Sequence, residues 1–119
     1  MKKIEAIIRT SKFDEVKEAL DTAGIQFFSY WDVTGVGNDV AKSVNTGRGK
    51  VSTSLIPRML LTIVVRDKNL QLTIDAILES AKTGITGDGK IFVSDLMESY
   101  RIRTGERGDE SLYNKHEED

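Results

Sequence analysis

The sequence predicts an α+β domain in which two helices cover one face of a four-stranded sheet. Two observations support this prediction. Segments whose apolar residues alternate with a period of two are interleaved with segments of helical period. The resulting strand–helix–strand order occurs twice, in halves of similar length that a glycine-rich stretch separates. Such a split βαβ arrangement is a ferredoxin-like fold, and 119 residues suit one domain with one core.

The first half of the chain contains a strand, a helix and a second strand. Residues 3–9 alternate apolar and polar side chains, which is typical of a strand. Apolar residues then recur at helical spacing over residues 13–23, with Ser11 placed to cap this helix and Gly24 placed to end it. Residues 25–34 are rich in aromatic and β-favouring side chains, and we expect them to form the second strand.

A long loop is expected between the two halves. Residues 35–54 have no usable periodicity, and four glycines lie there among small polar residues. Loops of about 20 residues are rare in compact domains and usually have a function. We therefore expect a mobile functional loop at about residues 36–56. A disordered insertion without a role is the alternative.

The second half repeats the order of the first. Pro57 opens a strongly apolar strand over residues 59–65, and Asp67 is placed to cap the second helix. Gly84 is expected to end that helix, whose apolar face is Leu70, Ile74, Ile77, Leu78 and Ala81.

Two extended segments are expected after the second helix. Residues 90–93 form the fourth strand after a glycine-rich turn, and residues 100–104 form a shorter extended piece. A polar, acidic tail follows over residues 113–119. The domain is therefore expected to span residues 1–112.

The strand over residues 59–65 is apolar on both of its faces, which is typical of a strand that is buried on both sides. Two helices can cover only one face of a four-stranded sheet. Self-association is the simplest way to cover the other face.

Composition argues against several classes of protein. The chain has 17 basic and 19 acidic residues, a net charge of −2, whereas general nucleic-acid binders carry a basic excess. It has no cysteine, and its single histidine, His116, lies in the polar tail. No nucleophile–histidine pair or carboxylate cluster at metal-ligand spacing is present, so we do not expect an enzyme. No apolar run approaches the roughly 20 residues that span a bilayer, and a cytoplasmic protein is expected.

A phosphate site is indicated by the run Gly87-Asp88-Gly89-Lys90. Glycines let backbone N–H groups approach a phosphate closely, and the lysine adds positive charge. In a strand over residues 100–104, Arg101 and Arg103 would point to the same side and could both bind phosphate oxygens. Asp88 and Asp39 could each contact a magnesium ion that a nucleotide brings. An ordinary turn followed by an ordinary strand is the alternative.

The sequence resembles the PII nitrogen-regulatory signal proteins over residues 1–112. The resemblance rests on residues 2–9, 14–20 and 81–84, and above all on Gly87-Asp88-Gly89-Lys90-Ile91-Phe92-Val93 and Arg101-Ile102-Arg103-Thr104-Gly105-Glu106. It implies a homotrimer whose intersubunit clefts bind ATP or ADP, with Mg²⁺ able to accompany ATP. It also implies that the long loop, called the T-loop in this family, docks onto an enzyme, a transcription factor, or a membrane transporter or its ATPase subunit.

The resemblance also implies roles for individual residues. The nucleotide-binding positions would be Ile7, Ser29, Gly35, Gly37, Asn38, Asp39, Thr62, Val64, Gly87, Asp88, Gly89, Lys90, Arg101, Ile102 and Arg103. The partner-binding positions of the T-loop would be Lys42, Arg48, Lys50 and Val51.

Several positions differ from the pattern of the family. Asp39 replaces a glutamine that ligates Mg²⁺ and helps seat 2-oxoglutarate, and Arg58 replaces the lysine that pairs with this effector. Val51 replaces the tyrosine that is nucleotidylated. Thr62 replaces a glutamate of the adenine and ribose pocket, and Asn38 stands where a basic residue is common. The resemblance therefore implies weak or lost 2-oxoglutarate sensing at Asp39 and Arg58, and no tyrosine nucleotidylation.

We therefore expect a nucleotide sensor that controls a partner protein and is not itself an enzyme. ATP and ADP would compete for the cleft and set the shape of the T-loop. Two alternatives remain open: a cleft that has turned to AMP or another adenine ligand, and a slow ATPase that uses the same site.

Overall fold

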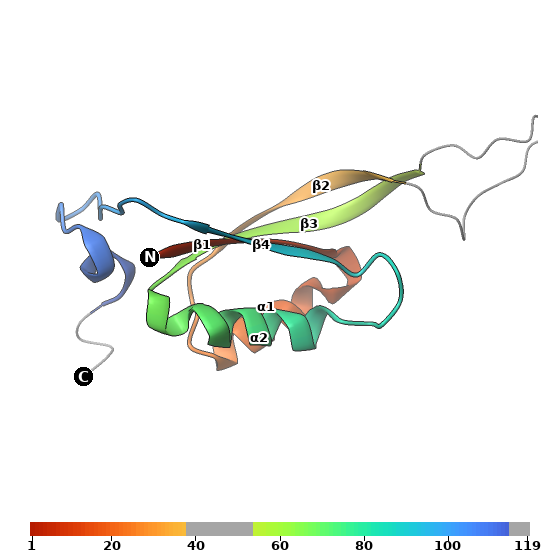
Figure 1. Cartoon of the computed structure of the whole chain (residues 1–119), viewed down its shortest axis with the longest axis horizontal. Helices are drawn as coiled ribbons and strands as arrows, with labels where there is room; N and C mark the ends of the chain where they lie inside the picture. Colours follow the sequence, from red (N-terminus) through yellow and green to blue (C-terminus); the bar gives the residue numbers. More distant parts are fainter. Residues whose placement is uncertain (38–53, 115–119) are drawn as a thin grey trace, which may run out of the picture.

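The computed structural model describes residues 1–37 and 54–114 (Figure 1). Its strands and α-helices are β1 (Lys2–Arg9), α1 (Phe13–Thr22), β2 (Ser29–Gly37), β3 (Ser54–Val65), α2 (Leu70–Ala81) and β4 (Gly89–Asp95). Short 3₁₀ turns lie at η1 (Thr10–Lys12), η3 (Asp67–Asn69) and η4 (Gly108–Leu112). This is the βαββαβ order of the ferredoxin-like fold, so the predicted fold class is confirmed.

The strands form one antiparallel four-stranded sheet in the order β2-β3-β1-β4. The pairing of β1 with β3 ends at Arg9 and Arg58, which lie opposite each other. The pairing of β2 with β3 continues to Gly37 and Ser54. The β2–β3 pair therefore extends beyond the end of β1 as a two-stranded stem (Figure 1).

Both helices lie on the same face of the sheet (Figure 1). Alternate residues of the two central strands point toward them, as the period of two requires. The fully buried side chains of this layer are Ile4, Ile8, Leu61 and Ile63 from the sheet and Val16, Leu20, Thr73 and Ile77 from the helices. Each large apolar side chain buried in this way contributes roughly 1.5–3 kcal/mol to folding.

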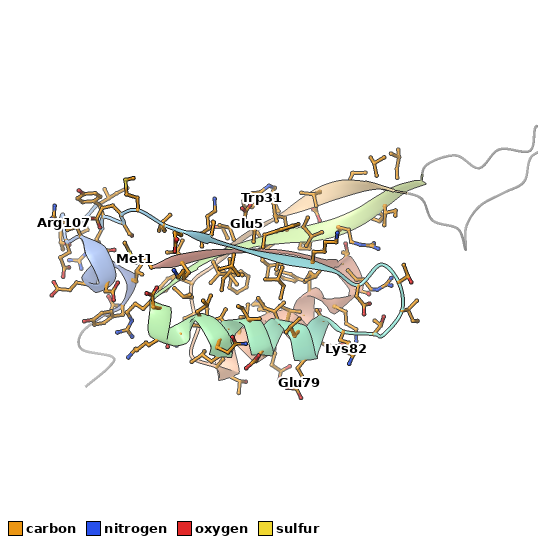
Figure 2. The ribbon with its side chains drawn as sticks, viewed as in Figure 1. Met1, Glu5, Trp31, Glu79, Lys82 and Arg107 are labelled. Carbon is orange, nitrogen blue, oxygen red and sulfur yellow. The ribbon has the colours of Figure 1, made fainter. Side chains whose placement is uncertain are left out.

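The opposite face of the sheet has no helix over it among the described residues, and we call it the open face. Strand register places on it the apolar side chains of Ile7, Trp31, Leu60, Val64 and Phe92. Trp31 is 48% exposed and Phe92 is 52% exposed. Figure 2 shows Trp31 on the side of the sheet away from the helices, whereas Glu79 lies on the helical side. The expectation that a second copy covers this face stays a prediction.

The bounds of two strands differ from those predicted. Residues 25–28 are not a strand but connect α1 to β2, with Ile25 buried in the core and the ring centroids of Phe28 and Phe13 6.4 Å apart. β2 instead runs to Gly37, and β3 begins at Ser54 rather than after Pro57. Proline is tolerated there because the β1 ladder has already ended, which leaves β3 only one neighbour at that point.

Neither predicted helix cap is used. Ser11 lies within η1, and α1 begins after Lys12 without a capping side chain. Asp67 lies within η3 and accepts a hydrogen bond from the N-terminal amine of Met1 at 2.9 Å. The helix stop at Gly24 is confirmed, since this residue has φ +87° directly after the C-cap of α1.

The second helix also differs from the prediction. It ends at Ala81, three residues before Gly84. Leu78 is not part of the buried face but is 54% exposed, and Thr73 is buried instead. The Thr73 hydroxyl donates to the Asn69 carbonyl at 2.6 Å, so burial of its polar atom carries no unmet hydrogen bond.

Residues 100–104 form a turn, so the predicted extended segment is wrong. The main chain folds back at Gly105, where φ is +75° and the N–H donates to the Arg101 carbonyl at 2.7 Å. An isolated bridge joins Tyr100 to Arg107. The turn and η4 lie beyond the end of β4, near the start of β1 (Figure 1). Among the described residues, no helix has the length and apolar character that crossing a membrane requires.

Candidate functional site

The loop between α2 and β4 has a shape that only glycine allows at two positions. Gly87 has φ +103° and Gly89 has φ +107°, values that other residues rarely adopt. A Cβ on Gly89 would lie 1.8 Å from the Ile7 carbonyl oxygen, so no side chain fits there. Among the described residues, no backbone–backbone hydrogen bond outside helices and strands uses the N–H of Gly87 or Asp88. The backbone of Gly89 thus packs directly against the backbone of β1, with no side chain between them.

Asp88 holds this loop together. One carboxylate oxygen accepts the N–H groups of Thr83 and Gly84, both at 2.8 Å. The other accepts the Thr83 hydroxyl and the Nε of Arg9, the latter at 3.0 Å. These hydrogen bonds, those from Thr83 above all, hold the pKa of Asp88 well below its usual range. Because both oxygens already accept hydrogen bonds, the Asp88 carboxylate stabilises the loop and has no oxygen left unengaged for a magnesium ion.

Two arginines brace the same loop from the sheet. Arg9 also donates to the Thr86 carbonyl at 3.0 Å, and Arg58 donates to the Gly87 carbonyl at 3.0 Å. A Cβ on Gly87 would meet one guanidinium nitrogen of each arginine at 3.2–3.3 Å. Two positive charges therefore lie beside the backbone of Gly87, and the loop carries a single carboxylate, Asp88, to offset them.

The predicted pocket residues lie together on the open face. Ser29 is paired with Thr62 across β2 and β3, and Val64 follows on the same face of β3. Lys90 is paired with Ile7 across β4 and β1. Directly paired side chains have Cβ atoms about 4.5–5.5 Å apart. Lys90, which the sequence predicts to bind phosphate, therefore lies next to Ile7, which is predicted to line the adenine pocket.

Thr62 has an unusual environment in this group. Its hydroxyl oxygen is buried and has no hydrogen-bond partner among the described residues. In the register, Ser29 lies on one side of it and Glu5 on the other. A buried hydroxyl without a partner is uncommon in folded proteins and calls for an explanation.

The remaining basic residues lie elsewhere. Arg101 is half-buried within the C-terminal segment, where it donates to the Tyr113 carbonyl at 2.8 Å. Ile102 and Arg103 are exposed in the turn. The prediction that the two arginines converge from one strand is therefore wrong, because residues 101–104 are not extended.

We call the loop over residues 82–88, between α2 and β4, the glycine loop, and the turn over residues 101–104 the arginine turn. The two lie at opposite ends of β4 (Figure 1). The strand from Gly89 to Asp95 has seven residues, which is about 20 Å of extended chain at roughly 3.3 Å a step. One copy of the chain therefore does not bring the two basic groups together.

Several predicted residues lie outside the described part of the chain. They are Asn38, Asp39, Lys42, Arg48, Lys50 and Val51. Gly35 and Gly37 are described and end β2. Over residues 1–37 and 54–114, no group of three or more acidic or histidine side chains is arranged to hold a metal ion.

The sequence-based reasoning missed Arg9 and Thr83, the main partners of Asp88. Arg9 is 79 positions from Asp88, so no local spacing connects them. The available signal was the position of Arg9 at the end of an alternating strand, since a strand end faces the loops that surround it. Thr83 lies five residues before Asp88, a separation that a compact loop can close.

Comparison with known proteins agrees with this fold. A family model described as "Nitrogen regulatory protein P-II" matches residues 1–106. Nitrogen regulatory protein P-II 1 of Methanothermobacter thermautotrophicus is 42% identical over 112 residues, which is 94% of this chain and 97% of the relative. The P-II proteins of Rhodobacter capsulatus (41% over 112 residues, 94% and 100%) and Bradyrhizobium diazoefficiens (44% over 108 residues, 91% and 96%) are similarly related.

These matches define a class of regulatory signalling protein built on the ferredoxin-like fold. The chain belongs to the nitrogen regulatory protein P-II family. The predicted family is therefore confirmed, and with it the broad role of a signal-transduction regulator.

Proposed function

We propose that this chain senses ATP and ADP at clefts formed between copies of itself and reports the result to a protein partner through the loop at residues 36–56. The observation that carries the proposal is the separation of the glycine loop from Arg101 and Arg103 along β4. A site that needs both groups is complete only when a second copy supplies one of them.

The open face supports a cleft of this kind. Its apolar side chains, among them Ile7 and Val64, suit an adenine ring, and Lys90 lies beside Ile7. The unpartnered hydroxyl of Thr62 would gain a partner from a ribose or a base. A trimer, as the family resemblance implies, would bury the exposed rings of Trp31 and Phe92.

The glycine loop supports phosphate binding at one end of that cleft. The N–H groups of Gly87 and Asp88 make no loop hydrogen bond to other backbone groups among the described residues, and the guanidinium groups of Arg9 and Arg58 lie beside them, so both could bind an anion. Arg9 neutralises Asp88 at 3.0 Å, so the carboxylate does not repel a phosphate strongly. ATP and ADP would differ in how far their phosphates reach along this positive surface.

We further propose that 2-oxoglutarate is sensed weakly or not at all. Arg58, the residue available to pair with it, already donates to the carbonyls of Pro57 and Gly87, at 2.8 and 3.0 Å. Asp39 adds a negative charge, and two unit charges about 4 Å apart repel by roughly 4 kcal/mol at an effective dielectric of 20. Control by nucleotidylation is also proposed to be absent, since no tyrosine lies between Trp31 and Ser99.

Calorimetry with ATP, ADP, AMP and 2-oxoglutarate, combined with sedimentation, tests the proposal. We expect ATP and ADP to bind a species of three chains, and 2-oxoglutarate not to bind to the protein saturated with Mg²⁺-ATP. Asp39→Gln is expected to restore some 2-oxoglutarate binding. Tighter binding of AMP than of ATP or ADP would favour an altered cleft, and steady phosphate release from ATP over hours would favour a slow ATPase.

A further inference from the structure

Arg101 is the centre of the hydrogen bonding in the C-terminal segment. Its NH1 donates to the Asn114 side-chain oxygen at 3.1 Å, and its NH2 donates to the Tyr113 carbonyl at 2.8 Å. Its Nε lies 3.5 Å from a carboxylate oxygen of Glu106, and its main-chain N–H donates to the Glu106 carbonyl at 2.7 Å. One guanidinium thus holds both the turn at residues 101–106 and the last described residues.

Residues 106–114, which we call the C-terminal latch, are fastened at further points. The Tyr113 ring lies 4.2 Å from the guanidinium carbon of Arg66, a cation–π contact. The Ser111 hydroxyl donates to the Ser99 hydroxyl at 2.8 Å, and the Gly108 N–H donates to the Ser99 carbonyl at 2.9 Å. The latch is therefore a packed element that contacts the Arg101 guanidinium and is held to the rest of the domain by several side chains.

Arg103 differs from Arg101 although only one residue separates them. It is exposed in the turn, and within the described residues it forms no hydrogen bond or ion pair. Arg103 could therefore bind a ligand without first breaking a hydrogen bond to the described residues, whereas Arg101 would have to break existing ones.

We propose that the C-terminal latch is autoinhibitory. The Tyr113 carbonyl and the Asn114 side chain accept the hydrogen bonds of the Arg101 guanidinium, and a nucleotide phosphate must displace these two residues to bind Arg101. The proposal rests on the proposed function, because it takes phosphate binding at Arg101 as its starting point. It adds that the NH1 and NH2 groups of Arg101 bind either residues 113–114 or the ligand, but not both at once. Arg103 has the ligand as its only proposed partner.

The chemistry of the two sets of acceptors makes this exchange feasible. The NH1 and NH2 groups of Arg101, which the proposed exchange involves, donate to neutral oxygens of Asn114 and Tyr113, whereas the Glu106 carboxylate lies at Nε, 3.5 Å away. A phosphate offers NH1 and NH2 charged oxygens, which form hydrogen bonds about twice as strong. Displacement also breaks the stacking of Tyr113 on Arg66. Nucleotide affinity is then lowered by the fraction of chains in which the latch is open.

The test compares wild-type protein with the double variant Tyr113→Leu, Asn114→Ala, which loosens the latch by removing the contact of the Tyr113 ring with Arg66 and the side-chain oxygen of Asn114, while the Tyr113 carbonyl stays. We expect the variant to bind ATP and ADP about three- to tenfold more tightly, as for a latch open in roughly a tenth to a third of wild-type chains. Hydrogen exchange over residues 106–114 should be faster in the variant without nucleotide, and faster in wild-type protein once ATP is added. Asp109→Asn, an exposed change within the same latch, is the matched control and should leave both measurements unchanged.

The outcomes separate the two proposals. Equal affinity of wild-type and double-variant protein, with no change of exchange on adding ATP, would overturn the latch while leaving nucleotide sensing intact. Failure of both proteins to bind either nucleotide would overturn the proposed function and the competition together. In that case, exchange over residues 106–114 in an Arg101→Ala variant still shows whether this residue holds the latch.

Discussion

The Nε of Arg9 donates to a carboxylate oxygen of Asp88 at 3.0 Å, joining residues 79 positions apart. This contact fastens the end of β1 to the loop in front of β4. Asp88 in turn fixes Thr83 and Gly84 on the far side of the loop. The shape of the glycine loop is thus set by an ion pair between the first strand and the loop itself.

Replacing Asp88 by asparagine should make stability less sensitive to acid. The pKa of Asp88 is lowered in the folded chain, so below about pH 4 the unfolded carboxyl takes up a proton while the folded one stays ionised. Acid therefore favours the unfolded state, and the stabilisation present at neutral pH is lost as the pH falls. Urea denaturation between pH 6 and pH 2.5 should show a shallower decline for Asp88→Asn. The same decline as in wild-type protein would contradict this, and Asp109→Asn is the control.

Replacing Gly89 by alanine should destabilise the fold. The added Cβ would overlap the Ile7 carbonyl oxygen, and the φ of +107° is unfavourable for alanine. Strain of this kind costs about 1–3 kcal/mol for the backbone alone. Gly37→Ala is the matched control, because a Cβ on Gly37 would meet no atom within 4 Å and its φ is not positive, and it should change stability by less than about 0.5 kcal/mol. Equal urea midpoints for the two variants would refute the packing described for Gly89.

A charge on the open face should disrupt self-association, whereas one on the helical layer should not. Phe92 and Leu78 are matched in exposure, at 52% and 54%, but lie on opposite sides of the molecule. Phe92→Asp would bury a carboxylate between copies, which is costly without a partner. Sedimentation velocity at micromolar concentration should show smaller species for Phe92→Asp and the wild-type species for Leu78→Asp. The reverse result would place the interface on the helices.

Removing the Arg103 side chain should weaken ATP and ADP by about 1.5–3 kcal/mol, the scale of a hydrogen bond to a charged group. Folding should be unaffected, because the residue is exposed and forms no hydrogen bond or ion pair with the described residues. Calorimetry measures the loss, and Arg107→Ala, another exposed arginine near the same turn, serves as the control. Unchanged affinity in Arg103→Ala would remove this residue from the site.

The sequence predicted the parts of the fold that depend on local periodicity. The alternation of Ile4, Ala6 and Ile8 located β1, and the glycine at position 24 located the end of α1. Cap assignments failed because Ser11 and Asp67 lie in 3₁₀ turns that precede each helix. Asp67 instead accepts a hydrogen bond from the N-terminal amine of Met1, a contact between distant residues that local spacing does not reveal.

The candidate site was less predictable for the same reason. The glycine run identified the loop, but not the long-range bonds of Arg9 that shape it. The alternation of Arg101, Ile102 and Arg103 predicts a strand, but three positions are too few to distinguish a strand from a turn. Gly105, which follows Thr104, was the missed signal, since its φ of +75° makes the reversal possible.

The two-stranded stem beyond Arg58 has a mechanical consequence. From Arg58 to Ser54 the stem spans four steps, or about 13 Å, without support from β1. Its base is held to the glycine loop by the hydrogen bond from Arg58 to the Gly87 carbonyl, at 3.0 Å. A tilt of about 10° at that base would move the far end of the stem by about 2 Å. The stem therefore pivots at its base, beside the backbone of Gly87. A small displacement at Gly87 produces a larger displacement at Gly37 and Ser54.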